Sequence, residues 1–77
     1  MDNKFSDIYF MSRCIEVAKQ GIGKTYPNPS VGCIIVNNNS IISEAYSSEH
    51  GGSHAEINAI NKIKDIKLLK TSTLYVT

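Results

Sequence analysis

The first regular pattern of apolar and polar positions lies in residues 6–20. Apolar side chains recur there every three or four residues, the spacing at which positions share one face of an α-helix. Ser6 suits the start of a helix, while Gly21 and Gly23 suit its end. The pattern predicts an amphipathic helix whose buried stripe consists of Ile8, Met11, Cys14, Ile15 and Ala18.

Two β-strands are predicted next. Residues 31–36 form an apolar run rich in β-branched side chains, too short for a helix and typical of a strand buried on both faces. Residues 41–46 resume an extended pattern. Three asparagines and a serine, residues 37–40, separate the two runs, and asparagine tolerates a left-handed backbone. The pair is therefore predicted to be a β-hairpin.

The remaining sequence predicts a helix and a third strand. The helix opens at residues 53–56 after a polar loop, and residues 73–77 alternate as a strand does. A strand–helix–strand unit places its strands parallel in one sheet, and such sheets are usually wider than three strands. We therefore expect a single domain over residues 1–77 that is incomplete after Thr77. The apolar side of the second helix would consist of Ile57, Ile60, Ile63 and Ile66.

Composition and charge exclude several classes of protein. With 42% hydrophobic and 19% charged residues, the chain fits a globular domain rather than a disordered one. A net charge of +1 gives no electrostatic footprint for nucleic acid or anionic lipid. No segment approaches a membrane-spanning length, and no secretory leader is evident. We expect a cytoplasmic protein in which Cys14 and Cys33 are reduced core thiols.

The triplet His54, Ala55, Glu56 carries the most chemical information. Histidine binds zinc, and an H-x-E triplet is half of the zinc deaminase signature, whose other half is P-C-x-x-C. A purely structural interpretation competes, because Ser53 and Glu56 also satisfy a capping box that starts a helix. Both interpretations remain open on these residues alone.

A second candidate feature is Asn28, which lies between Pro27 and Pro29. The two prolines restrict the backbone around it, so that its side chain is held in one direction. An amide offers both donors and an acceptor, which suit the edge of a heterocyclic base. Asn28 is therefore a candidate substrate contact.

Together these features resemble the deaminase domain of the riboflavin biosynthesis family RibD, within the cytidine-deaminase-like zinc deaminases. The similarity covers nearly the whole chain. Its most specific part is the T-x-P-N-P-x-V-G pattern of residues 25–32, which precedes G-G-S-H-A-E at residues 51–56 and T-L-Y-V-T at residues 73–77. The resemblance implies a three-layer α/β/α fold with a mixed sheet, of which this chain supplies the α-β-β-α-β part.

The resemblance also implies a reaction and its residues. The reaction is zinc-dependent hydrolytic deamination of diaminohydroxyphosphoribosylaminopyrimidine, a small pyrimidine nucleotide-like substrate. His54 would be a zinc ligand, Glu56 the catalytic proton shuttle and Asn28 a substrate contact. Family members usually have a histidine where this chain has Ser47, so His50 is a candidate to replace it in substrate binding. NADPH would be involved only if a reductase domain follows.

One departure from the family concerns the metal. The two zinc-binding cysteines of the family follow the T-L-Y-V-T strand, and this sequence stops before them. One histidine does not hold a catalytic zinc, so we expect the isolated chain to bind zinc weakly and to be inactive. Two alternatives remain: a related nucleotide or tRNA-base deaminase, and a non-catalytic module that associates through its sheet edge, as a homo-oligomer for example.

Overall fold

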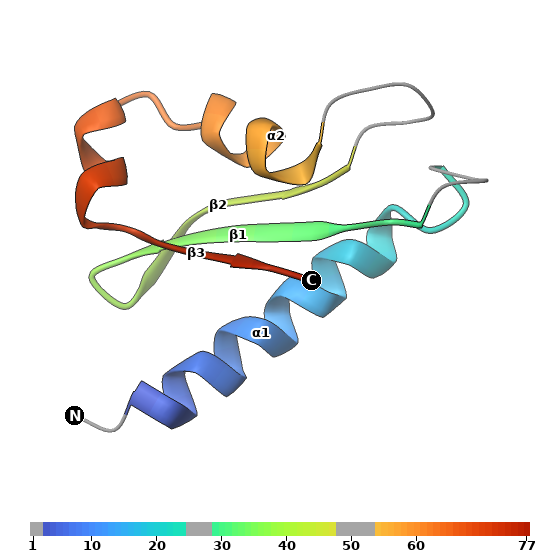
Figure 1. The fold of residues 1–77 in the computed structure, drawn as a ribbon, viewed down its shortest axis with the longest axis horizontal. Coiled ribbons are helices and arrows are strands. Elements are labelled where there is room, and N and C mark those ends of the chain that lie inside the picture. The colour runs from blue at the N-terminus through green and yellow to red at the C-terminus, as the bar shows by residue number, and fades with distance from the viewer. Residues whose placement is uncertain (1–2, 25–28, 48–53) are drawn as a thin grey trace.

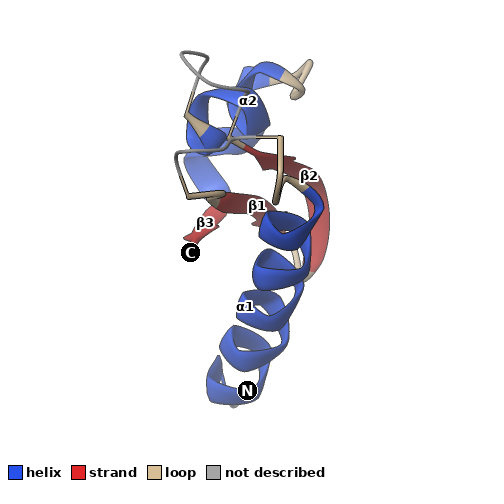
Figure 2. Cartoon of the chain, turned by 90° about the vertical axis from the view of Figure 1, so that its right-hand side faces the viewer, coloured by secondary structure: helices blue, strands red, loops and turns tan. Residues whose placement is uncertain are grey.

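The structure is a computed structural model, and it describes residues 3–24, 29–47 and 54–77. The two α-helices lie on opposite faces of a three-stranded sheet (Figures 1 and 2). The predicted α/β/α layering and α-β-β-α-β order are confirmed. None of the described helices is long and apolar enough to cross a membrane. The elements are α1 (Asn3–Gln20), β1 (Gly32–Asn37), β2 (Ser40–Tyr46), α2 (Ala55–Asn61), the 3-10 helix η1 (Ile66–Thr71) and β3 (Thr73–Val76).

The strand order is β2-β1-β3, and β1 pairs antiparallel with both neighbours. The strands that flank α2 are therefore parallel to each other, as expected, but β1 lies between them. The crossover through α2 and η1 carries the chain past β1 to its far side (Figure 1). The described strands contain no parallel neighbours, so the mixed character of the predicted sheet is not visible in them.

The β1–β2 hairpin follows the sequence prediction closely. Its turn consists of Asn38 and Asn39, whose φ angles are 55° and 63°. Two consecutive left-handed residues are what a two-residue turn needs to match the twist of its strands. β1 is buried along almost its whole length, because α1 covers one of its faces and α2 the other.

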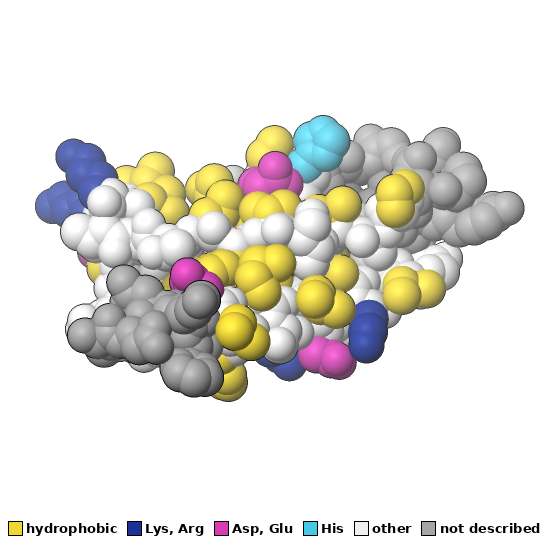
Figure 3. All heavy atoms as spheres, turned by 60° about the horizontal axis from the view of Figure 1, so that its bottom comes forward, with side chains coloured by type: hydrophobic (Ala, Val, Ile, Leu, Met, Phe, Trp, Pro, Cys, Tyr) yellow, Lys and Arg dark blue, Asp and Glu magenta, His cyan; other side chains and the backbone are white. Residues whose placement is uncertain are grey.

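The buried face of α1 differs from the predicted stripe. Ile8 and Ile15 are 61% and 46% exposed, and they lie on the outer side of the helix. Figure 3 shows hydrophobic side chains along the middle of the face on which α1 lies. The helix also begins at Asn3 rather than at residue 6. Cys14 and Ala18 are buried as predicted, and the other side chains of α1 that are buried are Phe10 and Val17.

The second helix was predicted too long and with the wrong face inward. α2 ends at Asn61, and the chain turns into η1 after Asp65, whose carboxylate accepts from the backbone N of Lys67. This local cap starts a separate helix. The side chains that face the sheet are Ala55 and Ala59, while Ile57 is 48% exposed. Small residues occupy the face of α2 that packs on the sheet, because they allow the helix to lie close to the strands. Ile60 and Ile66 are exposed as well, and Ile63 is half-buried.

Candidate functional site

Three chain segments meet where β1 begins. The backbone N of Ser47, just after β2, donates to the carbonyl of Val31 at 2.9 Å. The backbone N of Thr77, just after β3, donates to the carbonyl of Gly32 at 3.1 Å. Gly32 donates in return to Oγ1 of Thr77 at 2.9 Å. The carboxyl ends of β2 and β3 therefore flank the amino end of β1.

Two predicted site residues, His54 and Glu56, lie at the start of α2. His54 is the N-cap, with extended backbone (φ −69°, ψ 158°) and an exposed side chain that makes no capping hydrogen bond. Ala55 is fully buried against the sheet, in a cluster that includes Cys33. Glu56, the second helical residue, is half-buried. Burial of Ala55 thus places the two candidate residues on either side of it at the start of the helix, with His54 exposed and Glu56 half-buried.

The capping-box interpretation of Glu56 is weakened by this register. A capping box places its glutamate three residues after the N-cap, whereas Glu56 is only two residues after His54. Ser53 itself lies outside the described residues, as do the predicted substrate contacts Asn28 and His50. The capping function that would account for Glu56 without catalysis is therefore not supported by the observed helix start.

Glu56 acts electrostatically on a buried thiol of β1. The pKa of Cys33 is raised to about 11, mainly by burial and further by the negative charges of Cys14 and Glu56. A thiol with this pKa stays protonated at neutral pH in the metal-free chain. Cys33 is fully buried in β1, and among the described residues it belongs to no group that could hold a metal ion.

Cys14 is also a structural thiol. Its Sγ lies 3.2 Å from the carbonyl oxygens of both Gly32 and Tyr75, and its single S–H can donate to either of them. Burial raises its pKa. Both cysteines are free and buried, as the sequence predicted.

Among the described residues, His54 is a candidate zinc ligand. His54 fits that role because its exposed imidazole is not engaged in capping the helix that it begins. A catalytic zinc takes three protein ligands and one exchangeable position. Within residues 3–24, 29–47 and 54–77, no group of three or more histidine, cysteine, aspartate or glutamate side chains could hold a metal ion.

Ser47 has a structural function in this chain. Its side-chain hydroxyl accepts a hydrogen bond from the backbone N of Val31 at 3.1 Å, beside the backbone bond between the same residues. The half-buried serine thereby closes the β1–β2 ladder at the candidate site. A histidine at this position would extend further, so the substitution alters the site locally.

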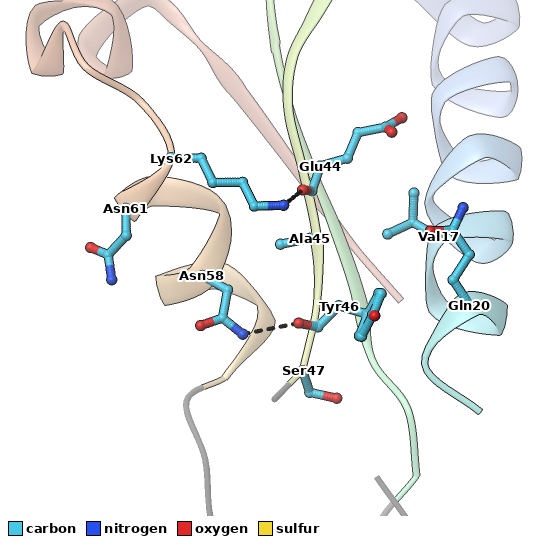
Figure 4. A pocket seen from close by; sticks show the side chains of 9 residues that line it. All are labelled: Val17, Gln20, Glu44, Ala45, Tyr46, Ser47, Asn58, Asn61 and Lys62. Carbon is cyan, nitrogen blue, oxygen red and sulfur yellow. Dashed lines mark hydrogen bonds between the residues drawn. The ribbon is translucent and has the colours of Figure 1, made fainter. Parts of the chain in front are cut away.

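A pocket of about 460 Å³ lies along the outer edge of β2, between α1 and α2 (Figure 4). Neither His54 nor Glu56 lines it. Asn58 lies on its wall and donates from Nδ2 to the carbonyl of Tyr46 at 2.9 Å. Asn58 belongs to none of the motifs recognised in the sequence. Its spacing of four residues from His54 is the one signal that places it a helical turn away from that residue. The lining residues are Val17, Gln20, Glu44, Ala45, Tyr46, Ser47, Asn58, Asn61 and Lys62.

An ion pair joins α1 to the same strand. Nε and Nη2 of Arg13 donate to the two carboxylate oxygens of Glu44 at 2.5 and 2.7 Å. These charge-assisted bonds lower the pKa of Glu44. β2 is thus fixed to both helices, through the side chain of Glu44 on one side and through contacts to α2 on the other.

A sheet between two helices, with an H-x-E triplet at the start of the second helix, agrees with the first half of the zinc deaminase signature. Residues 4–77 match the family described as the cytidine and deoxycytidylate deaminase zinc-binding region, and the chain belongs to this family.

Within this family, the chain is similar to proteins of riboflavin biosynthesis. The chain is 49% identical over 72 residues to riboflavin biosynthesis protein RibD of Actinobacillus pleuropneumoniae, covering 94% of this chain and 19% of that protein. It is 46% identical to diaminohydroxyphosphoribosylamino-pyrimidine deaminase of Buchnera aphidicola subsp. Acyrthosiphon pisum, covering 94% of this chain and 48% of the relative. The structure of RibD from Acinetobacter baumannii superimposes with a TM-score of 0.84 at 39% identity, covering 94% of this chain and 20% of that one. The chain thus spans from a fifth to about half of these relatives.

Proposed function

We propose that this chain contributes the histidine and glutamate half of a zinc-dependent deaminase site acting in riboflavin biosynthesis. The substrate would be diaminohydroxyphosphoribosylaminopyrimidine, after which the Buchnera relative is named. The observation that carries the proposal is the placement of His54 and Glu56 at the start of α2, at the end of the sheet where β2 and β3 finish. This chain's similarity to deaminases along residues 4–77 supports it.

In the proposed reaction, each candidate residue has a separate role. His54 would bind zinc through a ring nitrogen. When bound, zinc lowers the pKa of a water molecule to about 7 and so makes a nucleophile available at neutral pH. The Glu56 carboxylate would take up one proton from this water and deliver it to the ring nitrogen, and would then carry the water's second proton, released as the new carbonyl forms, to the departing ammonia. Asn28 and His50, outside the described residues, are proposed to contact the substrate.

The remaining zinc ligands are proposed to be the two cysteines that the family places after the third strand. The geometry supports this, because Thr77 is hydrogen-bonded to Gly32, and the next residue of β1, Cys33, shares a buried cluster with Ala55 at the start of α2. Sequence that continues from β3 would therefore leave the sheet at the end where α2 begins. NADPH would serve only a reductase domain of the same protein, and we propose a cytoplasmic location.

The test is deamination by the full-length protein that contains this chain. With zinc present, we expect the purified protein to release one ammonia for each diaminohydroxyphosphoribosylaminopyrimidine consumed, and to lose this activity on chelation. Cytidine, deoxycytidylate and tRNA serve as competing substrates. Ammonia release from one of these, and not from the riboflavin precursor, would contradict the proposal. The isolated 77-residue chain is still predicted to bind zinc weakly, and metal analysis showing one tightly held zinc per chain would disprove that.

A further inference from the structure

The helix that carries His54 and Glu56 has little apolar packing of its own. α2 comprises seven residues, and its buried side chains are Ala55 and Ala59. A helix this short is not stable without tertiary contacts. Two methyl groups resist rotation or sliding of a helix weakly, because they offer few interlocking surfaces. Other contacts must fix the position of α2 on the sheet.

Three side-chain hydrogen bonds join α2 to β2. Oγ of Ser43 donates to the carbonyl of Ala59 at 2.7 Å. Nζ of Lys62 donates to the carbonyl of Glu44 at 2.7 Å, and Nδ2 of Asn58 donates to the carbonyl of Tyr46 at 2.9 Å. Figure 4 shows the last two bonds reaching from α2 to the backbone of β2. These two bonds occupy backbone carbonyls of β2, whereas the bond of Ser43 runs from the strand to a backbone carbonyl of α2.

Asn58 is the contact closest to the candidate site. Its backbone N donates to the carbonyl of His54 at 3.1 Å, which closes the first turn of α2. Its side chain, half-buried, reaches the last residue of β2. One residue therefore connects the proposed zinc ligand to the sheet, whereas the bonds of Ser43 and Lys62 act further along the helix.

We propose that Asn58 is a positioning residue that fixes the first turn of α2, and with it His54 and Glu56, through its bond to the Tyr46 carbonyl. This inference rests on the proposed function. Asn58 would not touch zinc or substrate. Partners that orient metal ligands from outside the coordination sphere typically affect metal affinity or activity by about 10- to 100-fold when removed.

The experiment compares alanine variants of the full-length, zinc-loaded protein. Asn58→Ala removes the bond at the start of α2. Asn61→Ala is the matched control, since Asn61 is exposed on the same helix and points away from β2 (Figure 4). Lys62→Met removes a different α2–β2 bond and controls for loosening of the helix as a whole. Asn58→His tests rescue, because an imidazole N–H can again donate toward the strand.

The readouts are zinc affinity, the visible spectrum of the cobalt-substituted protein, kcat, KM and melting temperature. We expect Asn58→Ala to weaken zinc binding and lower kcat by about 10- to 100-fold, to shift the cobalt bands and to leave KM nearly unchanged. Asn61→Ala and Lys62→Met should keep the wild-type spectrum and kcat, and Asn58→His should recover part of both.

Two results would overturn the inference. One is a wild-type spectrum and kcat for Asn58→Ala. The other is an equal loss in Lys62→Met, which would mean that general docking of α2 matters and Asn58 has no special position. Failure of the proposed function is a separate result, since the wild-type protein would then release no ammonia while Asn58→Ala could still change zinc affinity and the cobalt spectrum.

Discussion

Gly32 and Cys14 lie in direct backbone contact where α1 crosses β1. A Cβ added to Gly32 would lie 2.3 Å from the carbonyl oxygen of Cys14 and 2.7 Å from the backbone N of Ala18. Sγ of Cys14 lies 3.2 Å from the carbonyl oxygen of the same glycine. The absence of a side chain at residue 32 therefore sets the distance between the helix and the sheet, and with it which face of α1 is buried.

Replacing Gly32 with alanine should destabilise the full-length protein by about 1–3 kcal/mol, the usual cost of forcing an extra carbon into a packed interior. Urea unfolding measures the change. Ser12→Ala is the control, because Ser12 is exposed on the same helix that packs against Gly32. A loss for Gly32→Ala no larger than that for the control would contradict the close contact.

The Arg13–Glu44 pair should make the free energy of unfolding depend on pH in the acidic range. Its hydrogen bonds lower the pKa of Glu44 in the folded state. The stabilisation is therefore complete above the unfolded pKa of about 4.3 and declines as the pH falls through the lower folded value. We expect Glu44→Gln to be less stable than wild type at pH 6 and the difference to shrink by pH 3. Unfolding curves across this range would show a constant difference if the pair contributed nothing.

Substitutions of His54 and Glu56, at the start of α2, should affect zinc binding and activity differently. His54→Ala is expected to lose zinc and activity together. Glu56→Gln should keep zinc but lower kcat by about 10²- to 10⁴-fold, because the amide cannot accept the proton. Metal analysis beside an ammonia-release assay separates the two effects. An active Glu56→Gln enzyme would restrict Glu56 to a structural function.

Neither Cys14 nor Cys33 should react with a thiol reagent in the folded protein. Both are buried, and the pKa of Cys33 is about 11, so almost no thiolate is present at pH 8. Peptide-level mass spectrometry after iodoacetamide treatment should find both unmodified in buffer and both modified in denaturant. Rapid labelling of Cys33 in buffer would show that α2 does not cover β1.

Several elements could be predicted because their signals are local. Asn38 and Asn39 form the two-residue turn, since asparagine accepts the left-handed backbone at little cost. The apolar run at residues 31–36 gave the buried strand β1. The H-x-E triplet was expected to open a helix, and α2 does begin directly after His54.

Other features could not be predicted from local pattern. Apolar spacing on α1 allowed more than one buried stripe, and Ile15 was assigned inward although Val17 is the residue that packs on the sheet. On α2 the isoleucines gave the stronger apolar signal, yet Ala55 and Ala59 face the sheet. Hydrophobicity ranks side chains by transfer to an apolar environment, whereas the choice of face here depends on how closely two backbones approach.

The sequence by itself determined the order of the elements, the hairpin turn, the buried central strand and the chemistry available at His54 and Glu56. Only the tertiary structure decided that β3 pairs with β1, which helix faces are buried and that Asn58 links the first turn of α2 to Tyr46. The physical reason is the distance along the chain over which each interaction acts. Backbone preference and side-chain chemistry act within a few residues, while strand neighbours and helix faces depend on contacts between segments distant in the chain.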